Sequence, residues 1–406
     1  MRVLVVTQYF WPETFRVNEV VESLREAGCQ VIVLTGQPNY PDGKTFAGHR
    51  AWNIGHEVDP HGVSVFRVPL APRGKGTAVR LIANYLSFVA SASLIGPWLL
   101  RGQRFDVVFV YGISPILQAL PAMILARLKR AALVTWVQDL WPQSLEVTGF
   151  VRNRKLLALV TAIVRWIYRR NDLLLVQSQA FIAEVQPLAG GTPVRYHPNP
   201  GERAFGRDLP EPARGFEFPP GFNVVFAGNL GTAQALDTVL NAAELLLEKR
   251  DIQIVLIGSG SRGTWLMEEA TRRGLQNVRF AGRMPPHAMP GVFLQASALL
   301  VSLVRNPTMS QTIPSKVQAY LAAGRPIIGC LDGEGARVIE EAGAGVICAA
   351  EDAGALAAAI LRVRAMSPAD LRRLGEAGRC YYHEHFDPAV LARRLVQHFQ
   401  DAAPEH

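Results

Sequence analysis

The amino-acid sequence predicts an α/β protein made of two doubly wound parallel-sheet domains that face a cleft. Short β-branched and apolar runs alternate with helix-length segments, and parallel strands require such crossover helices. Residues 197–221 interrupt the alternation with proline, glycine and charge, which indicates an interdomain linker. A length of 406 residues also exceeds one ordinary core. We therefore expect a first domain over residues 1–200 and a second over 201–386, with a last helix (387–406) packing back on the first.

The first domain begins with a continuous β-branched run, residues 3–6, which predicts a central buried strand. A helical pattern over 18–27 follows and stops at Gly28, where a left-handed residue suits a helix end. The next strand is expected at 31–34. Further strand-like runs occur at residues 63–68, 107–111, 133–137 and 173–176.

The second domain repeats this alternation, starting with a strand at 223–227. Its other strand-like runs are residues 252–257, 278–280, 298–303, 326–329 and 346–348. Sheets of this kind bind ligands beyond the carboxyl ends of their strands. Candidate functional residues are therefore sought in the loops that follow the strands.

Charge is unevenly distributed along the chain. Residues 1–200 hold 21 Lys and Arg against 12 Asp and Glu, whereas residues 201–406 hold 21 against 22. A basic half fits an anionic membrane surface. Nucleic acid is not expected as a partner, because no basic run is interleaved with aromatic residues. The four scattered cysteines and the short apolar run after Arg2 predict a cytoplasmic protein without a signal peptide.

Two segments bear on membrane contact. Residues 81–100 carry no charge and are long enough to span a bilayer, but they contain Asn84 and a Gly96-Pro97 break. A crossing there would place strands of one sheet in different compartments, so we expect a buried or surface-dipping helix. Residues 152–170 form a basic amphipathic pattern, which fits either an anionic membrane face or a solvated helix over the sheet.

Glycine turns follow several strands of the second domain. The strand at 223–227 runs into Gly228-Asn229-Leu230-Gly231, and glycines there let a backbone approach a ligand closely. The alternative is that this turn is only a tight strand-to-helix connection that binds no ligand. Similar turns contain Gly258 and Gly260, and Arg283-Met284 follow a further strand.

A second element of this domain is Pro314-Ser315-Lys316, which precedes a helical pattern ending at Gly324. Proline is favoured in a helix's first turn, so Ser315 and Lys316 are expected at the start of the helix. A lysine is unfavourable at the positive end of a helix dipole, but it is well placed if a diphosphate binds there. A solvated surface lysine is the alternative.

Polar loops follow the strands of the first domain. Glu13, Arg16 and Asn18 follow the first strand, and Asn39-Tyr40 follow the second. The first loop lacks the Gly-x-Gly-x-x-Gly pattern of a dinucleotide-binding dehydrogenase. Asp139 follows the strand at 133–137, where it would orient or deprotonate an acceptor hydroxyl or cap the next helix. The chain has no Asp-x-Asp, so no metal site is expected.

The sequence resembles the retaining glycosyltransferases of family 4, which have the GT-B fold of two Rossmann-like domains. Within them it is most similar to the bacterial amino-sugar and colanic-acid transferases related to L-fucosamine transferase. The motifs that carry the resemblance are Tyr9-Phe10-Trp11-Pro12-Glu13, Pro38-Asn39-Tyr40-Pro41, Gln138-Asp139-Leu140-Trp141-Pro142, Ala227-Gly228-Asn229-Leu230-Gly231 with Thr232 and Gln234, and Pro314-Ser315-Lys316 through Pro326.

The resemblance implies a UDP-sugar held by the second domain and an acceptor held by the first. Residues 228–234 with Gly258, Gly260, Pro314 and Ser315 would face the donor, and Arg283-Met284 the uracil. The donor is a co-substrate, and no cofactor is implied. Asp139 stands where many members have a histidine that contacts the sugar. The glutamate pair of the wider family is replaced by Gln311 and Ala319, and the Arg and Lys that often follow the first strand of the second domain are missing, with Asn229 and Thr232 nearby instead. The diphosphate charge would then fall mainly on Lys316 and helix N-termini, and the ribose contact is unassigned.

We therefore expect a metal-independent enzyme of surface-polysaccharide synthesis, with Asp139 and Lys316 as candidate catalytic residues. It would transfer a sugar, with N-acetylated amino sugars favoured, to a polyprenyl-diphosphate-linked saccharide. Glu13, Arg16, Asn18, Asn39 and Tyr40 would bind that acceptor at the inner face of the cytoplasmic membrane. A UDP-sugar 2-epimerase and a non-catalytic sugar-nucleotide-binding scaffold are the alternatives.

Overall fold

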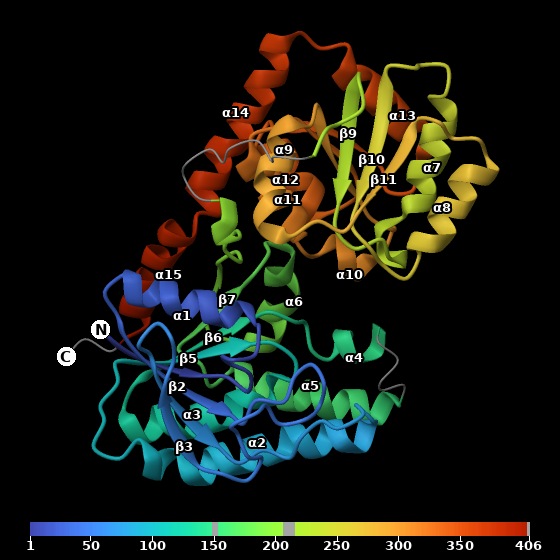
Figure 1. Cartoon of the computed structure of the whole chain (residues 1–406). Coiled ribbons are helices and arrows are strands. Elements are labelled where there is room, and N and C mark those ends of the chain that lie inside the picture. Colours follow the sequence, from blue (N-terminus) through green and yellow to red (C-terminus); the bar gives the residue numbers. More distant parts are fainter. Residues whose placement is uncertain (148–152, 206–215, 404–406) are drawn as a thin grey trace. The chain divides into compact units, whose positions relative to one another are not determined.

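The computed structural model describes residues 1–147, 153–205 and 216–403. The chain divides into two compact units, one formed by Met1–Pro198 with the segment from Leu391, the other by Asn199–Val390. Each unit is built around a single sheet, and the fold is α/β as predicted (Figure 1).

The first unit contains an eight-stranded sheet of order β3-β4-β2-β1-β5-β6-β7-β8, in which every neighbouring pair is parallel except β3 with β4. Its strands are β1 Arg2–Val6, β2 Gln30–Gly36, β3 Gly55–Val58, β4 Ser64–Val68, β5 Val107–Gly112, β6 Ala132–Val137, β7 Leu173–Val176 and β8 Val194–Tyr196. The expected strands are all present. The edge strands β3 and β8 were not predicted from the sequence, because each is short and partly exposed.

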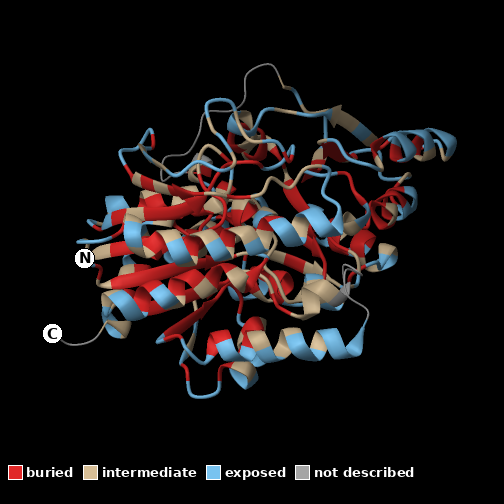
Figure 2. Cartoon of the chain, turned by 90° about the horizontal axis from the view of Figure 1, so that it is seen from below, coloured by how far each residue is buried: buried red, intermediate tan, exposed pale blue. Residues whose placement is uncertain are grey.

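Alternate residues of this sheet enter two separate cores. Leu4, Val6 and Val108 belong to the core that the helices α2, α3, α5 and α6 cover, whereas Val3 and Val5 belong to the core covered by α1 and α15. The helices of this unit are α1 Arg16–Glu26, α2 Ala78–Leu99, α3 Ala119–Lys129, α4 Gln143–Val147, α5 Arg154–Tyr168, α6 Ala180–Ala189 and α15 Pro388–Ala402. Burial is concentrated in the strands, and the helices carry exposed positions on their outward sides (Figure 2).

The last helix, α15, packs on the first unit. Its Leu395 and Phe399 are buried with residues of β1, β5 and β6, and the Phe399 ring lies 5.2 Å from that of Phe109. The division between the units falls between Val390 and Leu391, inside α15, rather than at its start.

Helix α2 is long and apolar enough, by length and composition alone, to cross a membrane. It connects β4 to β5, two strands of one sheet. Its buried residues Asn84, Phe88, Ala92 and Gly96 recur every four positions, so one side of the helix faces the protein. Because α2 joins two strands of one sheet and buries one side against the protein, it lies along the protein surface.

The second unit contains a six-stranded parallel sheet of order β11-β10-β9-β12-β13-β14. Its strands are β9 Phe222–Ala227, β10 Ile252–Ile257, β11 Val278–Gly282, β12 Ala298–Ser302, β13 Ile327–Cys330 and β14 Gly345–Cys348. Its helices are α7 Leu236–Leu245, α8 Gly263–Arg272, α9 Met289–Gln295, α10 Pro307–Ser310, α11 Ser315–Ala323, α12 Glu334–Glu341, α13 Ala353–Arg364 and α14 Pro368–His385. Two cores lie on its faces, as expected for a doubly wound sheet.

Candidate functional site

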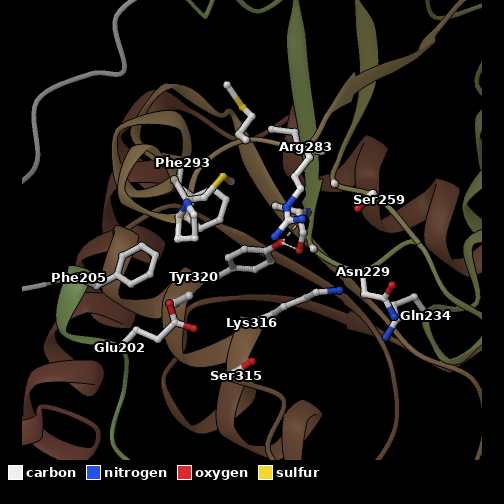
Figure 3. A pocket seen from close by; sticks show the side chains of 18 residues that line it. Glu202, Phe205, Asn229, Gln234, Ser259, Arg283, Phe293, Ser315, Lys316 and Tyr320 are labelled. Carbon is white, nitrogen blue, oxygen red and sulfur yellow. Dashed lines mark hydrogen bonds between the residues drawn. The ribbon is translucent and has the colours of Figure 1, made fainter. Parts of the chain in front are cut away.

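The second unit has a cavity of about 670 Å³ at the carboxyl ends of β9 and β10. Its walls come from the turns after β9, β10 and β11, from the start of α11, from α9, and from the short 3₁₀ turn Arg203–Phe205. Figure 3 shows Lys316 reaching from α11 toward Asn229 and Gln234, with Arg283 and Ser259 on another wall. The volume suits a small-molecule ligand.

The two strand-end glycines are required by the close packing of the cavity wall. Gly228 has a φ of 134°, and a Cβ there would lie 2.6 Å from Cε of Lys316. Gly258 has a φ of 137°, and its Cβ would lie 1.9 Å from the Gly228 carbonyl oxygen. The Gly228 N–H also donates to the Ile257 carbonyl at 2.8 Å. Side chains at either position would displace Lys316 or separate β9 from β10.

The rest of the glycine turn packs around the Asn229 side chain. A Cβ on Gly231 would lie 2.7 Å from Nδ2 of Asn229, and one on Gly260 would lie 2.5 Å from its Oδ1. Gln234 stabilises the turn, because its Oε1 accepts a hydrogen bond from the Gly231 N–H at 3.3 Å. The turn is therefore a preformed wall that presents Asn229 and Gln234 to the cavity.

Helix α11 brings Lys316 to this wall. Pro314 is the N-cap residue rather than a residue of the first turn, and Ser315 is the first helical residue. In the described structure no side chain caps this helix start, so its first N–H groups remain available to an anion. The Tyr320 hydroxyl accepts a hydrogen bond from the Ala227 N–H at 3.0 Å and ties the helix to β9.

The ammonium group of Lys316 is buried in an unusual environment. Its Nζ lies 3.8 Å from the centroid of the Phe226 ring and has no hydrogen-bond partner among the described residues. Burial lowers the pKa of Lys316 to about 7. A buried cation without a counter-ion is costly, and an anionic ligand in the cavity would supply the missing partner.

The structure brings most of the expected donor residues together in this cavity. Those that line it are Gly228, Asn229, Gln234, Gly258, Arg283, Met284, Ser315 and Lys316. The others lie behind the wall or beside it: a Cβ on Gly231 or Gly260 would meet Asn229, Thr232 is exposed at the start of a 3₁₀ turn, and Pro314 precedes α11.

Sequence reasoning missed several lining residues that come from distant segments. Glu202 and Phe205 follow the division between the units, and Phe293 lies on α9. Ala319, which stands in place of a family glutamate, lines the same cavity as Glu202. No local pattern marks these residues, because their common feature is their position around one cavity.

In the first unit, Glu13 is almost completely buried beneath the loop that follows β2. Its Oε1 accepts hydrogen bonds from the N–H groups of Asn39 and Tyr40, both at 2.7 Å. Burial raises the pKa of Glu13 to about 7, although the backbone N–H groups and Arg67 favour the ionised form. Glu13 therefore joins the two loops that follow β1 and β2.

Of the other expected acceptor residues, some hold the loops together through hydrogen bonds and others lie at the surface. Asn18 accepts from the Trp11 N–H and donates to the Glu13 carbonyl, at 3.1 and 2.7 Å. Asn39 is buried and donates to the Gln37 carbonyl at 3.1 Å. Arg16 begins α1 and is half-buried.

Tyr40 is exposed at the loop surface, and the guanidinium of Arg73 lies 5.2 Å from its ring centroid. The same guanidinium donates to the Tyr9 hydroxyl at 2.9 Å. Tyr40 and Arg73 thus form an aromatic and cationic surface beyond the ends of β1 and β2.

Asp139 connects two loops of the first unit. Its Oδ2 accepts a hydrogen bond from the Ser114 N–H at 2.7 Å, so it caps the loop after β5. The Trp141 indole N–H donates to the Ser114 hydroxyl at 2.8 Å and strengthens the same link. Asp139 therefore ties its own loop to the end of a neighbouring strand, and its expected role as a cap of the following helix stays a prediction.

No group of three or more His, Cys, Asp or Glu side chains within the described ranges is arranged to hold a metal ion.

Comparison with known proteins follows the same division of the chain. Residues 14–201 match the model of the glycosyl transferase 4-like domain, and residues 221–365 match that of the glycosyl transferases group 1. The chain belongs to glycosyltransferase family 4. It is 26% identical over 340 residues to a putative colanic acid biosynthesis glycosyl transferase, WcaI, of Escherichia coli (strain K12), covering 80% of this chain and 82% of that protein.

Solved structures share the fold over nearly the whole chain of this glycosyltransferase. Sucrose-phosphate synthase of Thermosynechococcus elongatus superposes with a TM-score of 0.70 at 18% identity and 98% coverage of both chains. Anabaena Alr3699/HepE in complex with UDP superposes with a TM-score of 0.69 at 13% identity, covering 99% of this chain and 100% of that one. The predicted GT-B fold is confirmed.

Proposed function

We propose that this glycosyltransferase transfers a sugar from a UDP-sugar, with retention, to a polyprenyl-diphosphate-linked saccharide. The product would serve surface-polysaccharide synthesis at the inner face of the cytoplasmic membrane. The donor sugar is proposed to be an N-acetylated amino sugar, on the sequence resemblance. The observation that carries the donor proposal is the buried ammonium of Lys316 at the uncapped start of α11.

A diphosphate fits the electrostatics of this end of the cavity. Lys316 Nζ lacks a hydrogen-bond partner among described residues, and the α11 start offers N–H groups and a positive dipole end. As the sugar leaves, negative charge grows on the diphosphate, and Lys316 together with these N–H groups would stabilise it. Enzymes commonly obtain their largest rate gain from such preorganised charge.

The nucleoside would occupy the cavity wall formed by Arg283, Met284 and Phe293. We assign the ribose to Glu202, because it lines the same cavity as Ala319 and is the acidic residue among the described residues that line it. A carboxylate accepts hydrogen bonds from both hydroxyls of a ribose diol. HepE, which has the same fold, was solved with UDP and with UDP and glucose, which supports a uridine donor here.

The acceptor would contact the first unit. Tyr40 with Arg73 offers an exposed ring and a cation suited to a saccharide and a phosphate, and Arg16 lies at the start of α1. Glu13, Asn18 and Asn39 would shape these loops through the hydrogen bonds described above. Asp139 is proposed to orient the acceptor hydroxyl through its remaining carboxylate oxygen.

Incubation with a panel of UDP-sugars, with and without a membrane extract, tests this function. Transfer requires the extract and moves radiolabelled sugar into a lipid phase. Epimerisation proceeds without it, and a binding scaffold consumes no donor. The anomeric configuration of the product by NMR tests retention, and unchanged turnover in EDTA tests metal independence. Donor turnover without an acceptor, or binding without turnover, would favour the corresponding alternative.

A further inference from the structure

Helix α2 carries an apolar stripe on the side that faces away from the sheet. Its exposed residues recur every three or four positions, so they share one side of the helix. Leu94 is 79% exposed and Leu86 is 54% exposed. The large apolar side chains of the stripe are Val79, Ile82, Leu86, Leu94 and Trp98. A stripe of this size on a water-soluble surface indicates a binding partner.

Two other helices of the same layer also expose large apolar residues. Helices α2, α3 and α5 all bury their inner sides in one core on one face of the sheet, and α2 packs against α3. Their outer sides expose further large apolar residues, Ile124 and Leu128 on α3, and Leu156, Leu159 and Trp166 on α5. In the opposite layer, the described residues of α1 and α15 expose no large hydrophobic side chain.

All charged residues within α2, α3 and α5 are basic. Helices α2, α3 and α5 contain no Asp or Glu, whereas α1 in the opposite layer contains three glutamates. The basic residues within the three helices are Arg80, Arg127, Lys129, Arg154, Lys155 and Arg165. Two tryptophans at the border of this surface lie under cations, Trp98 at 5.3 Å from Arg101 and Trp166 at 4.7 Å from Arg170. Apolar stripes with basic and tryptophan borders suit the interface of an anionic bilayer.

We propose that the outer side of α2, α3 and α5 docks on an anionic membrane surface, with α2 lying in the plane of the interface. In a dimer formed through this face, the basic residues of one copy would lie opposite those of the other. The repulsion between like charges disfavours such a dimer. Crossing is disfavoured because α2 joins two strands of one sheet. This proposal rests on the proposed function in one respect: a lipid-linked acceptor is the reason why the enzyme would bind a membrane.

Co-sedimentation of the full chain with vesicles tests the docking surface without any substrate. The vesicles contain phosphatidylcholine alone or mixed with phosphatidylglycerol. The test variant combines Leu86→Asp with Leu94→Asp, and the control is Leu245→Asp, at a 63% exposed leucine of α7 in the other unit. Thermal unfolding of each variant checks that the fold is kept.

The wild type is expected to bind anionic vesicles more tightly than neutral ones. The double variant should lose roughly 100-fold in partition coefficient, because each leucine inserted into the interface contributes about tenfold. The control should bind as the wild type does. Equal binding by the double variant, or no preference for anionic vesicles, would overturn the proposal.

Two further measurements decide between occupants. Alkaline carbonate is expected to release the protein from cell membranes, and its retention would overturn the in-plane arrangement of α2. Sedimentation equilibrium without vesicles is expected to show no self-association that depends on Leu86 and Leu94, and such self-association would instead identify a second copy as the partner. UDP binding is measured separately, so a failed docking result leaves the donor proposal standing.

Discussion

Replacing Lys316 by methionine is expected to stabilise the ligand-free protein while weakening its binding of UDP. Methionine keeps an unbranched apolar stem and removes the ammonium buried against Phe226. Burial lowers the pKa of Lys316 from 10.5 to about 7. Keeping the group in the fold at pH 7 therefore costs roughly 4 kcal/mol. Removing this cost predicts a Tm higher by roughly 8–16 °C.

The stability difference between wild type and K316M should depend on pH. Between pH 7 and about 10.5 the unfolded wild-type chain binds more protons than the folded chain, because the folded-state pKa of Lys316 is the lower one. The free energy of unfolding of the wild type therefore rises over this range, by roughly 2 kcal/mol from pH 7 to pH 9. K316M lacks this contribution, so its advantage should shrink as the pH rises.

Urea unfolding at pH 7 and 9 and calorimetric titration with UDP measure both effects. K316M should bind UDP about 10–100-fold more weakly, the range expected for one charge-assisted hydrogen bond to a phosphate. Lys249→Met is the control, because this lysine is exposed and should change neither quantity appreciably. A K316M protein that is less stable than the wild type and binds UDP normally would refute the reasoning.

Three other predictions concern protons and the nucleoside. UDP binding at pH 8 should take up a proton, because a diphosphate raises the lowered pKa of Lys316; calorimetry in buffers of different ionisation enthalpy measures the uptake, which K316M should lack. E202Q should weaken UDP binding about tenfold but leave binding of 2′,3′-dideoxy-UDP unchanged, and an equal loss for both ligands would contradict a ribose contact. Burial raises the pKa of Glu13 to about 7, so the folded chain holds the extra proton and wild-type stability should fall as the pH rises from about 4.5 to 7. E13Q should remove that fall in urea titrations, and a slope equal to the wild type's would show that Glu13 titrates normally.

The central strands could be predicted because each is a continuous apolar run buried on both faces. The strand β1 and the strand β5 are fully or almost fully buried and border each other in the sheet. The strand β3 has no such run, since its residues are half-buried or exposed. It becomes a strand because it pairs with the edge of β4, and that pairing exists only in the folded chain.

The candidate donor site could be predicted where its residues are consecutive. The turn from Gly228 and the start of α11 are local patterns of glycine, proline and lysine. Glu202, Phe205 and Phe293 join them only because the chain folds. Their side-chain types are ordinary at those positions, so no sequence pattern indicates them.

The sequence by itself determined that Lys316 stands at the start of a helix next to a glycine turn, since proline and glycine impose their backbone conformations locally. Only the tertiary structure decided what that lysine experiences. Packing of α11 against β9 places its Nζ over the Phe226 ring and away from water, which lowers its pKa to about 7. Burial depends on every segment that surrounds a group, and this is why no local pattern could reveal it.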